Sequence, residues 1–113
     1  MQQLDQYSLD QLNSIQRQAV ISASAHILVL AGAGSGKTRV LAYRIWWLIR
    51  NRIDPLNILA VTFTNKAAAE MRARLEQMLG LNLRQSWIGT FHGLAHRMLR
   101  LHWQEADLPQ TFQ

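Results

Sequence analysis

The chain has 113 residues, enough for one small domain. Hydrophobic residues make up 49% of the sequence, so a packed core is expected and wholesale disorder is excluded. The formal net charge of +5 permits a nucleic acid or a nucleotide as partner without requiring either, and the absence of cysteine excludes disulfides and thiolate metal sites.

The N-terminal part of the chain predicts a short helix after a flexible start. Residues 1–11 are mostly polar and are expected to be loosely held. A helix is expected over residues 13–22, because Asn13 is a good N-cap and Gln16, three residues later, completes a capping box.

A strand and a second helix are expected next. Residues 26–30 form an apolar run that is typical of a strand buried on both faces of a parallel sheet. Residues 37–50 have the periodicity of a helix. Four of its apolar residues are expected to face the core: Val40, Leu41, Ile45 and Leu48.

Two further strand–helix pairs complete the predicted order. Residues 58–63 read as a second buried strand. The third helix is capped by Thr64 or the following residue and ends at Gly80, a typical C-terminal stop. A short strand over residues 86–90 precedes a fourth helix over residues 91–103.

This alternation of strands and helices predicts an α/β fold, a parallel sheet covered by flanking helices. Three strands make a thin sheet, so the chain is expected to be a piece of a larger domain. The start of the sequence lacks a basic-then-apolar opening, and no apolar stretch is long enough to span a bilayer. A cytoplasmic protein with no membrane partner is therefore expected.

A glycine-rich octapeptide lies between the first predicted strand and the helix that follows it. It consists of Ala31, Gly32, Ala33, Gly34, Ser35, Gly36, Lys37 and Thr38. Glycines let backbone N–H groups turn toward an anion, and the helix N-terminus adds partial positive charge. Lys37 can reach the β- and γ-phosphates of a nucleotide, and the Thr38 hydroxyl can ligate Mg²⁺. Ala31 stands at a position where glycine is usual, and that position tolerates another small residue. A flexible glycine turn, the alternative, would not require the lysine and threonine.

Three more segments accompany this loop: residues 12–16, residues 62–68 and residues 89–93. The last two follow predicted strands, at the edge where open α/β sheets bind ligands. Together with the loop they resemble the UvrD/Rep/PcrA family of superfamily 1 DNA helicases. A phosphate loop alone would also admit kinases, GTPases and transporters, whereas the four segments together do not.

The resemblance covers residues 12–103 and implies a domain assignment. These residues would be the N-terminal part of the first RecA-like motor domain, a P-loop NTPase with a three-layer arrangement of parallel sheet and helices. Residues 104–113 would begin a connection to a helical insertion. The implied function is an ATP-dependent helicase that moves 3′ to 5′ on single-stranded DNA and unwinds duplex in repair or replication. Single-stranded DNA, single–double strand junctions and repair proteins would be its partners, and the cytoplasmic nucleoid its location.

The resemblance also assigns residues to ATP and Mg²⁺. Gln16 would hydrogen-bond the adenine, residues 31–38 would hold the phosphates and Mg²⁺, and Arg39 would pack against the adenine plane. The capping box remains a second role for Gln16. A solvated arginine in the first turn remains the alternative for Arg39.

Two segments would contact the DNA strand. They comprise Phe63, Thr64, Asn65 and Lys66, and, after the last strand, Thr90, Phe91 and His92. Bases stack on aromatic rings without sequence preference, and polar or basic groups hold the phosphates. The alternatives are a core position for Phe63, a solvated Lys66 and a structural His92.

ATP hydrolysis needs more than a phosphate loop, because carboxylates normally hold Mg²⁺ and position the attacking water. No strand of this sequence ends in an acidic pair, so the chain is expected to be an N-terminal fragment that hydrolyses almost no ATP alone. Two alternatives are a catalytically inactive nucleotide- or nucleic-acid-binding remnant of such a helicase and a nucleotide switch or small-molecule kinase. The kinase has no need of the two strand-end segments.

Overall fold

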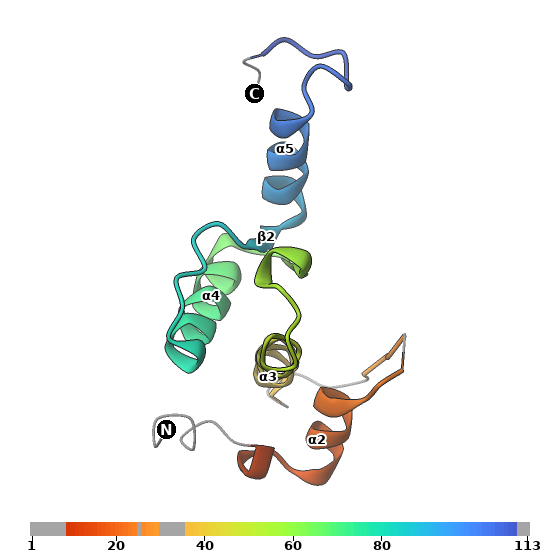
Figure 1. Ribbon diagram of the computed structural model, residues 1–113, viewed down its shortest axis with the longest axis vertical. Coiled ribbons are helices and arrows are strands. Elements are labelled where there is room, and N and C mark those ends of the chain that lie inside the picture. The colour runs from red at the N-terminus through yellow and green to blue at the C-terminus, as the bar shows by residue number, and fades with distance from the viewer. Residues whose placement is uncertain (1–8, 25, 30–35, 111–113) are drawn as a thin grey trace.

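The computed structural model describes residues 9–24, 26–29 and 36–110. Its elements, shown in Figure 1, are two short 3-10 helices, four α-helices and two strands within these residues. They run in the order η1 (Leu9–Gln11), α2 (Ser14–Ile21), α3 (Lys37–Arg50), η2 (Pro55–Asn57), β1 (Leu59–Thr62), α4 (Asn65–Leu79), β2 (Trp87–Thr90) and α5 (Phe91–Leu101).

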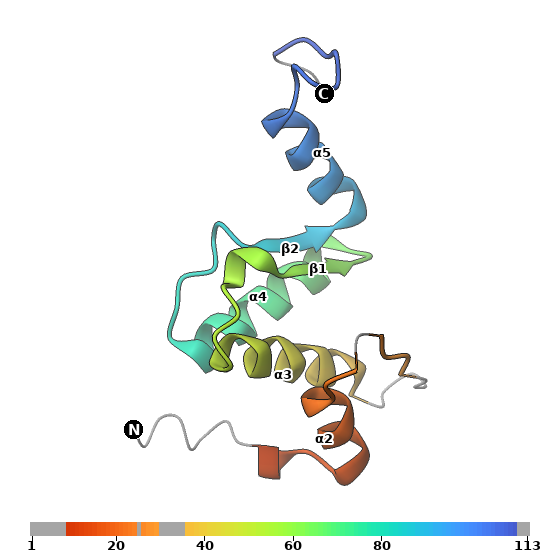
Figure 2. The same cartoon turned by 45° about the vertical axis from the view of Figure 1, so that its right-hand side comes forward.

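The two strands form a small parallel sheet. Leu59 lies opposite Trp87, and the register continues to the pair Thr62 and Thr90. Helix α4 makes the crossover between the strands. In Figure 2, α3 and α4 lie below the strands and α5 rises above them. A parallel pair with flanking helices is compatible with the predicted α/β class.

The predicted strand over residues 26–30 is not found in its described part, residues 26–29. Leu28 is 83% exposed there, and Ile27 and Val29 line a cavity against α2 and α3. A strand exists only where a neighbouring strand accepts and donates its backbone hydrogen bonds. The apolar run predicts a tendency to be buried but supplies no pairing partner, so this prediction was wrong for the described residues.

Of the four residues of helix α3 that were predicted to face the core, Ile45 is buried as expected and the other three are not. The buried residues of α3 are Ala42, Tyr43, Ile45 and Trp46, whereas Leu41 is 39% exposed and Val40 and Leu48 are half-buried. The helix is apolar on most of its circumference, so periodicity alone allows more than one inward face. Packing against α4 on one side and α2 on the other selects the tyrosine and the tryptophan.

Local chemistry at the helix ends follows the sequence closely. The Asn13 capping box is present, Thr64 accepts a hydrogen bond from the Ala67 N–H, and Gly80 ends α4 at a φ of 66°. Arg44 donates to the carbonyl oxygens of residues 20 and 22. It thereby joins α3 to the C-terminal end of α2.

We expect Leu75→Ala to lower the free energy of unfolding by about 2–5 kcal/mol, because its side chain is fully buried and its loss leaves a cavity. Leu101→Ala is the control, since Leu101 is 62% exposed and should change stability by less than about 0.5 kcal/mol. Urea denaturation followed by circular dichroism measures both. Equal losses for the two variants would contradict the packing described here.

Candidate nucleotide and nucleic-acid site

The N-terminus of α3 is the described end of the phosphate loop. Ala31, Gly32, Ala33, Gly34 and Ser35 lie outside the described residues. Gly36 has a φ of 83°, in the left-handed region that favours glycine. A Cβ at Gly36 would lie 3.2 Å from Nε2 of Gln16, so the glutamine amide sits directly against the end of the loop.

Gln16 takes part in the capping box of α2, and the nitrogen of its side-chain amide still faces Gly36. Its Oε1 accepts a hydrogen bond from the Asn13 N–H at 3.1 Å, and its own N–H donates to Asn13 Oδ1 at 2.8 Å. The capping box therefore uses one lone pair of Oε1 and the backbone N–H of Gln16. The Nε2 amide group still faces Gly36. Capping and ligand recognition are compatible at this residue.

Helix α3 begins differently from the other α-helices. Asn13, Thr64 and Thr90 cap α2, α4 and α5 with their side chains. For α3, no side chain within the described residues accepts a hydrogen bond from its first turn. Backbone N–H groups in the first turn of a helix are able to bind an anion.

Lys37 and Thr38 are exposed on this first turn. Lys37 lines an open cavity of about 390 Å³ bordered by α2, Ser24, residues 26–29 and α3. The structure thus places the lysine, the threonine and the Gln16 amide around one helix end. No group of three or more His, Asp or Glu side chains suited to a metal occurs in the described part of the chain. Thr38 as a Mg²⁺ ligand stays a prediction from the sequence.

Arg39 points to the other side of α3. Its Nη2 donates to the backbone oxygen of Gln11 at 2.6 Å, and its Cζ lies 5.8 Å from the centre of the Tyr43 ring. These residues line a second hollow of about 280 Å³. Its other side is lined by three residues of α4: Arg74, Gln77 and Met78. Arg39 is therefore not simply solvated. The sequence gives no signal for Gln11 and Tyr43, because their contacts join residues far apart in the chain.

The two strand-end segments meet in a third hollow, of about 540 Å³. It is lined by Phe63, Thr64, Asn65, Thr90, Phe91, His92 and Gly93. The register explains this meeting: Thr62 and Thr90 are paired, so the residues after them leave the sheet side by side. Gly93, which the prediction omitted, could have been found from its place next to His92 in the same segment.

The two phenylalanines of this hollow are exposed. Phe63 is 92% exposed and Phe91 65%, and their ring centres lie 6.1 Å apart with planes at 49°. The core interpretation of Phe63 is thereby excluded. Burial normally stabilises an aromatic ring, so two adjacent exposed rings mark a surface suited to an apolar or stacking ligand.

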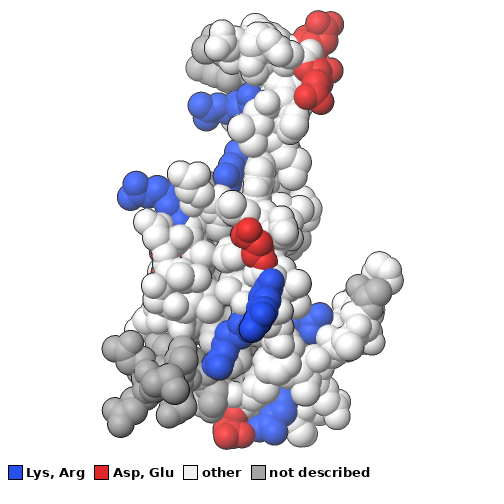
Figure 3. Space-filling model, in the orientation of Figure 1, with Lys and Arg blue, Asp and Glu red and all other residues white. Residues whose placement is uncertain are grey.

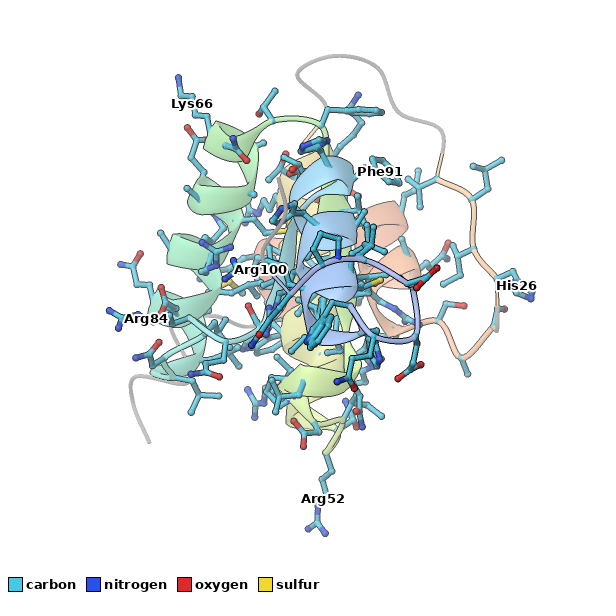
Figure 4. All side chains as sticks on the ribbon, turned by 90° about the horizontal axis from the view of Figure 1, so that it is seen from above. His26, Arg52, Lys66, Arg84, Phe91 and Arg100 are labelled. Atoms are coloured by element: carbon cyan, nitrogen blue, oxygen red, sulfur yellow. The ribbon has the colours of Figure 1, made fainter. Side chains whose placement is uncertain are left out.

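Lys66 is the one predicted contact residue that does not line the hollow. Figure 4 shows it extending outward from the start of α4, away from Phe91, while Arg52 lies at the opposite end of the view. On the face drawn in Figure 3, Lys and Arg side chains lie in several separate places rather than in one patch. On this face, charge does not mark out a nucleic-acid site.

None of the helices that the structure describes is long and apolar enough to cross a membrane.

Comparison with known proteins links these features to one family. The model of the UvrD/REP helicase N-terminal domain matches residues 12–113. DNA helicase II of Escherichia coli strain K12 is 59% identical over 108 residues, which cover 95% of this chain and 15% of that protein. ATP-dependent DNA helicase PcrA of Staphylococcus epidermidis is 50% identical over 102 residues, 89% of this chain and 14% of that protein.

A third relative, ATP-dependent DNA helicase PcrA of Bacillus subtilis, is 50% identical over 93 residues, 81% of this chain and 13% of that protein. The chain thus spans about 15% of the length of the curated relatives it matches. Because the family model matches nearly the whole chain, including Gln16, the helix end at Lys37 and both strand-end segments, the chain belongs to the UvrD/REP helicase N-terminal domain family.

Proposed function

We propose that this chain is the part of an ATP-dependent DNA helicase that binds both ATP and the DNA strand. Residues 12–103 would form the beginning of its first RecA-like motor domain, a three-layer P-loop NTPase, and residues 104–113 the start of a connection to a helical insertion. The observation that carries the proposal is the hollow in which Phe63 and Phe91 are exposed side by side.

ATP would bind at the N-terminus of α3. Its phosphates would lie on the N–H groups of the first turn of α3 and on Lys37, while the Thr38 hydroxyl would be one ligand of Mg²⁺. The Gln16 amide, held against Gly36, would hydrogen-bond the adenine. Arg39 would pack against the adenine plane, because a flat guanidinium suits an aromatic face.

Single-stranded DNA would bind across the third hollow. Its bases would stack on Phe63 and Phe91, a contact that is open to every base. The N-termini of α4 and α5 both reach this hollow, and their partial positive charges favour phosphates there. Each capping hydroxyl, that of Thr64 and that of Thr90, accepts a hydrogen bond from its helix and keeps its own proton to donate. His92 and Asn65 would add polar contacts.

Stacking on the two rings and phosphate binding at the helix N-termini do not depend on the edges of the bases. Binding to DNA without sequence preference is therefore expected, as a translocating enzyme requires. The PcrA relatives are named ATP-dependent DNA helicases. Movement from 3′ to 5′, unwinding at single–double strand junctions, repair-protein partners and a place in the cytoplasmic nucleoid belong to the proposal through the family resemblance. Hydrolysis would require carboxylates that the sequence does not provide at its strand ends.

Lys37→Ala should abolish DNA-stimulated ATP hydrolysis in the longest natural polypeptide that contains this chain, because it removes the cation that holds the β- and γ-phosphates. Binding to single-stranded DNA without nucleotide should stay within about twofold, since Lys37 lies outside the third hollow. Steady-state ATPase assays and fluorescence anisotropy measure the two properties.

The control is Lys66→Ala, which makes the same chemical change outside both the nucleotide cavity and the hollow. It should leave hydrolysis at saturating DNA near its original rate. If Lys37→Ala retained full turnover, the nucleotide half of the proposal would be wrong.

Phe63→Leu and Phe91→Leu should each weaken binding to an oligothymidine by about 5- to 150-fold, because loss of base stacking costs about 1–3 kcal/mol per base. Anisotropy of a labelled oligonucleotide at fixed salt measures this, and ATP affinity without DNA should be unchanged. Leu101→Ala, which removes an exposed apolar side chain beyond the hollow, is the matched control. Losses no larger than that of the control would refute stacking on these rings.

A further inference from the structure

Three residues contact one another on the side of α3 that faces α4. Arg39 Nη2 donates to the backbone oxygen of Gln11 at 2.6 Å, and the Tyr43 hydroxyl donates to Gln11 Oε1 at the same distance of 2.6 Å. Arg39 closes the triangle by lying over the Tyr43 ring. Gln11 thus receives one hydrogen bond on its backbone and one on its side chain, from residues one helical turn apart.

The parts of this network are themselves anchored. Tyr43 is 4% exposed and meets the ring of Trp46 edge-on, with centroids 5.6 Å apart. The other end of η1 is held by Arg17, whose Nη2 donates to the Leu9 oxygen at 3.3 Å and to Asp10 Oδ1 at 2.9 Å. Gln11 is therefore fixed from both sides before any ligand arrives.

Arg39 keeps most of its hydrogen-bond donors in this arrangement. Neither of the ion pairs found among the described residues includes it. A guanidinium has five N–H donors, and the Gln11 oxygen takes only one of them. The side chain is thus oriented by neutral partners, one of which is the Tyr43 ring, and its remaining N–H groups are not bound to a carboxylate.

We infer that Gln11 and Tyr43 are positioning residues that hold the Arg39 guanidinium ready for the base of the bound nucleotide. This inference rests on the proposed role of Arg39 in ATP binding. Gln11 lies just before the region that the family model matches, residues 12–113. One of the two positioning residues is therefore outside the matched region. Gln11 and Tyr43 would thus order one side chain of the proposed ATP site.

The physical effect is preorganisation. A long, flexible arginine loses rotamer freedom when a ligand orders it, and this loss weakens binding. A side chain that is already ordered loses less, so the affinity for nucleotide rises while the chemical step is untouched. Breaking the network should therefore raise KM for ATP and leave kcat unchanged.

The test removes the hydrogen bond between Tyr43 and Gln11 from either end. In the longest natural polypeptide that contains this chain, Tyr43→Phe and Gln11→Ala should each raise KM for ATP by about three- to tenfold with kcat unchanged. Gln18→Ala is the control, because Gln18 is exposed on α2 and lines none of the three hollows. It should leave both constants unchanged.

A double-mutant cycle separates positioning from general stability. In an Arg39→Ala background, Tyr43→Phe should have no further effect on KM, because there is no guanidinium left to hold. Full additivity of the two changes, or an unaltered KM in both single variants, would overturn the inference. Lys37→Ala in the same assay tests the proposed function separately: if it loses ATP turnover while the cycle is additive, the nucleotide site stands and only the positioning role fails.

Discussion

The parallel pairing of β1 and β2 is the constraint on which the rest of the structure depends. Because Thr62 and Thr90 are paired, both strands end at the same edge, and the following residues start α4 and α5 next to each other. Two helix N-termini and two phenylalanine rings are thereby brought to one hollow. A shift of the register by one residue would turn each side chain to the opposite face and separate them. The candidate DNA contacts are thus a consequence of backbone hydrogen bonding.

The arginine side chains of this protein connect its elements as well as carrying surface charge. Several guanidinium groups donate to backbone carbonyl oxygens and tie one element to the next: those of Arg17, Arg39, Arg44, Arg72 and Arg97. Arg97 also lies over the Trp87 ring, with its Cζ 4.0 Å from the ring centre. Much of the positive charge therefore serves internal contacts. This is why net charge permits a nucleic-acid partner but does not locate it.

The local elements of the fold were predictable, because their causes lie within a few residues. The Asn13 capping box, the Thr64 cap and the glycine stop at Gly80 each involve neighbours in the sequence. The bounds of α3, Lys37–Arg50, agree with the prediction for the same reason. The expected strand over residues 26–30 fails in its described part, because a strand requires a distant partner that no local pattern can supply.

The sequence by itself determined the family: the glycine-rich octapeptide, residues 12–16 and the two strand-end segments resemble one family of helicases, whose N-terminal domain model matches residues 12–113. Only the tertiary structure decided how these residues meet. It placed Gly93 in the hollow and Lys66 outside it, buried Tyr43 in place of Leu41, and joined Arg39 to Gln11. The physical reason is the range of the interactions. Capping and helix periodicity act over one turn, whereas the register of a sheet and the packing of two helices depend on residues that are distant in the chain.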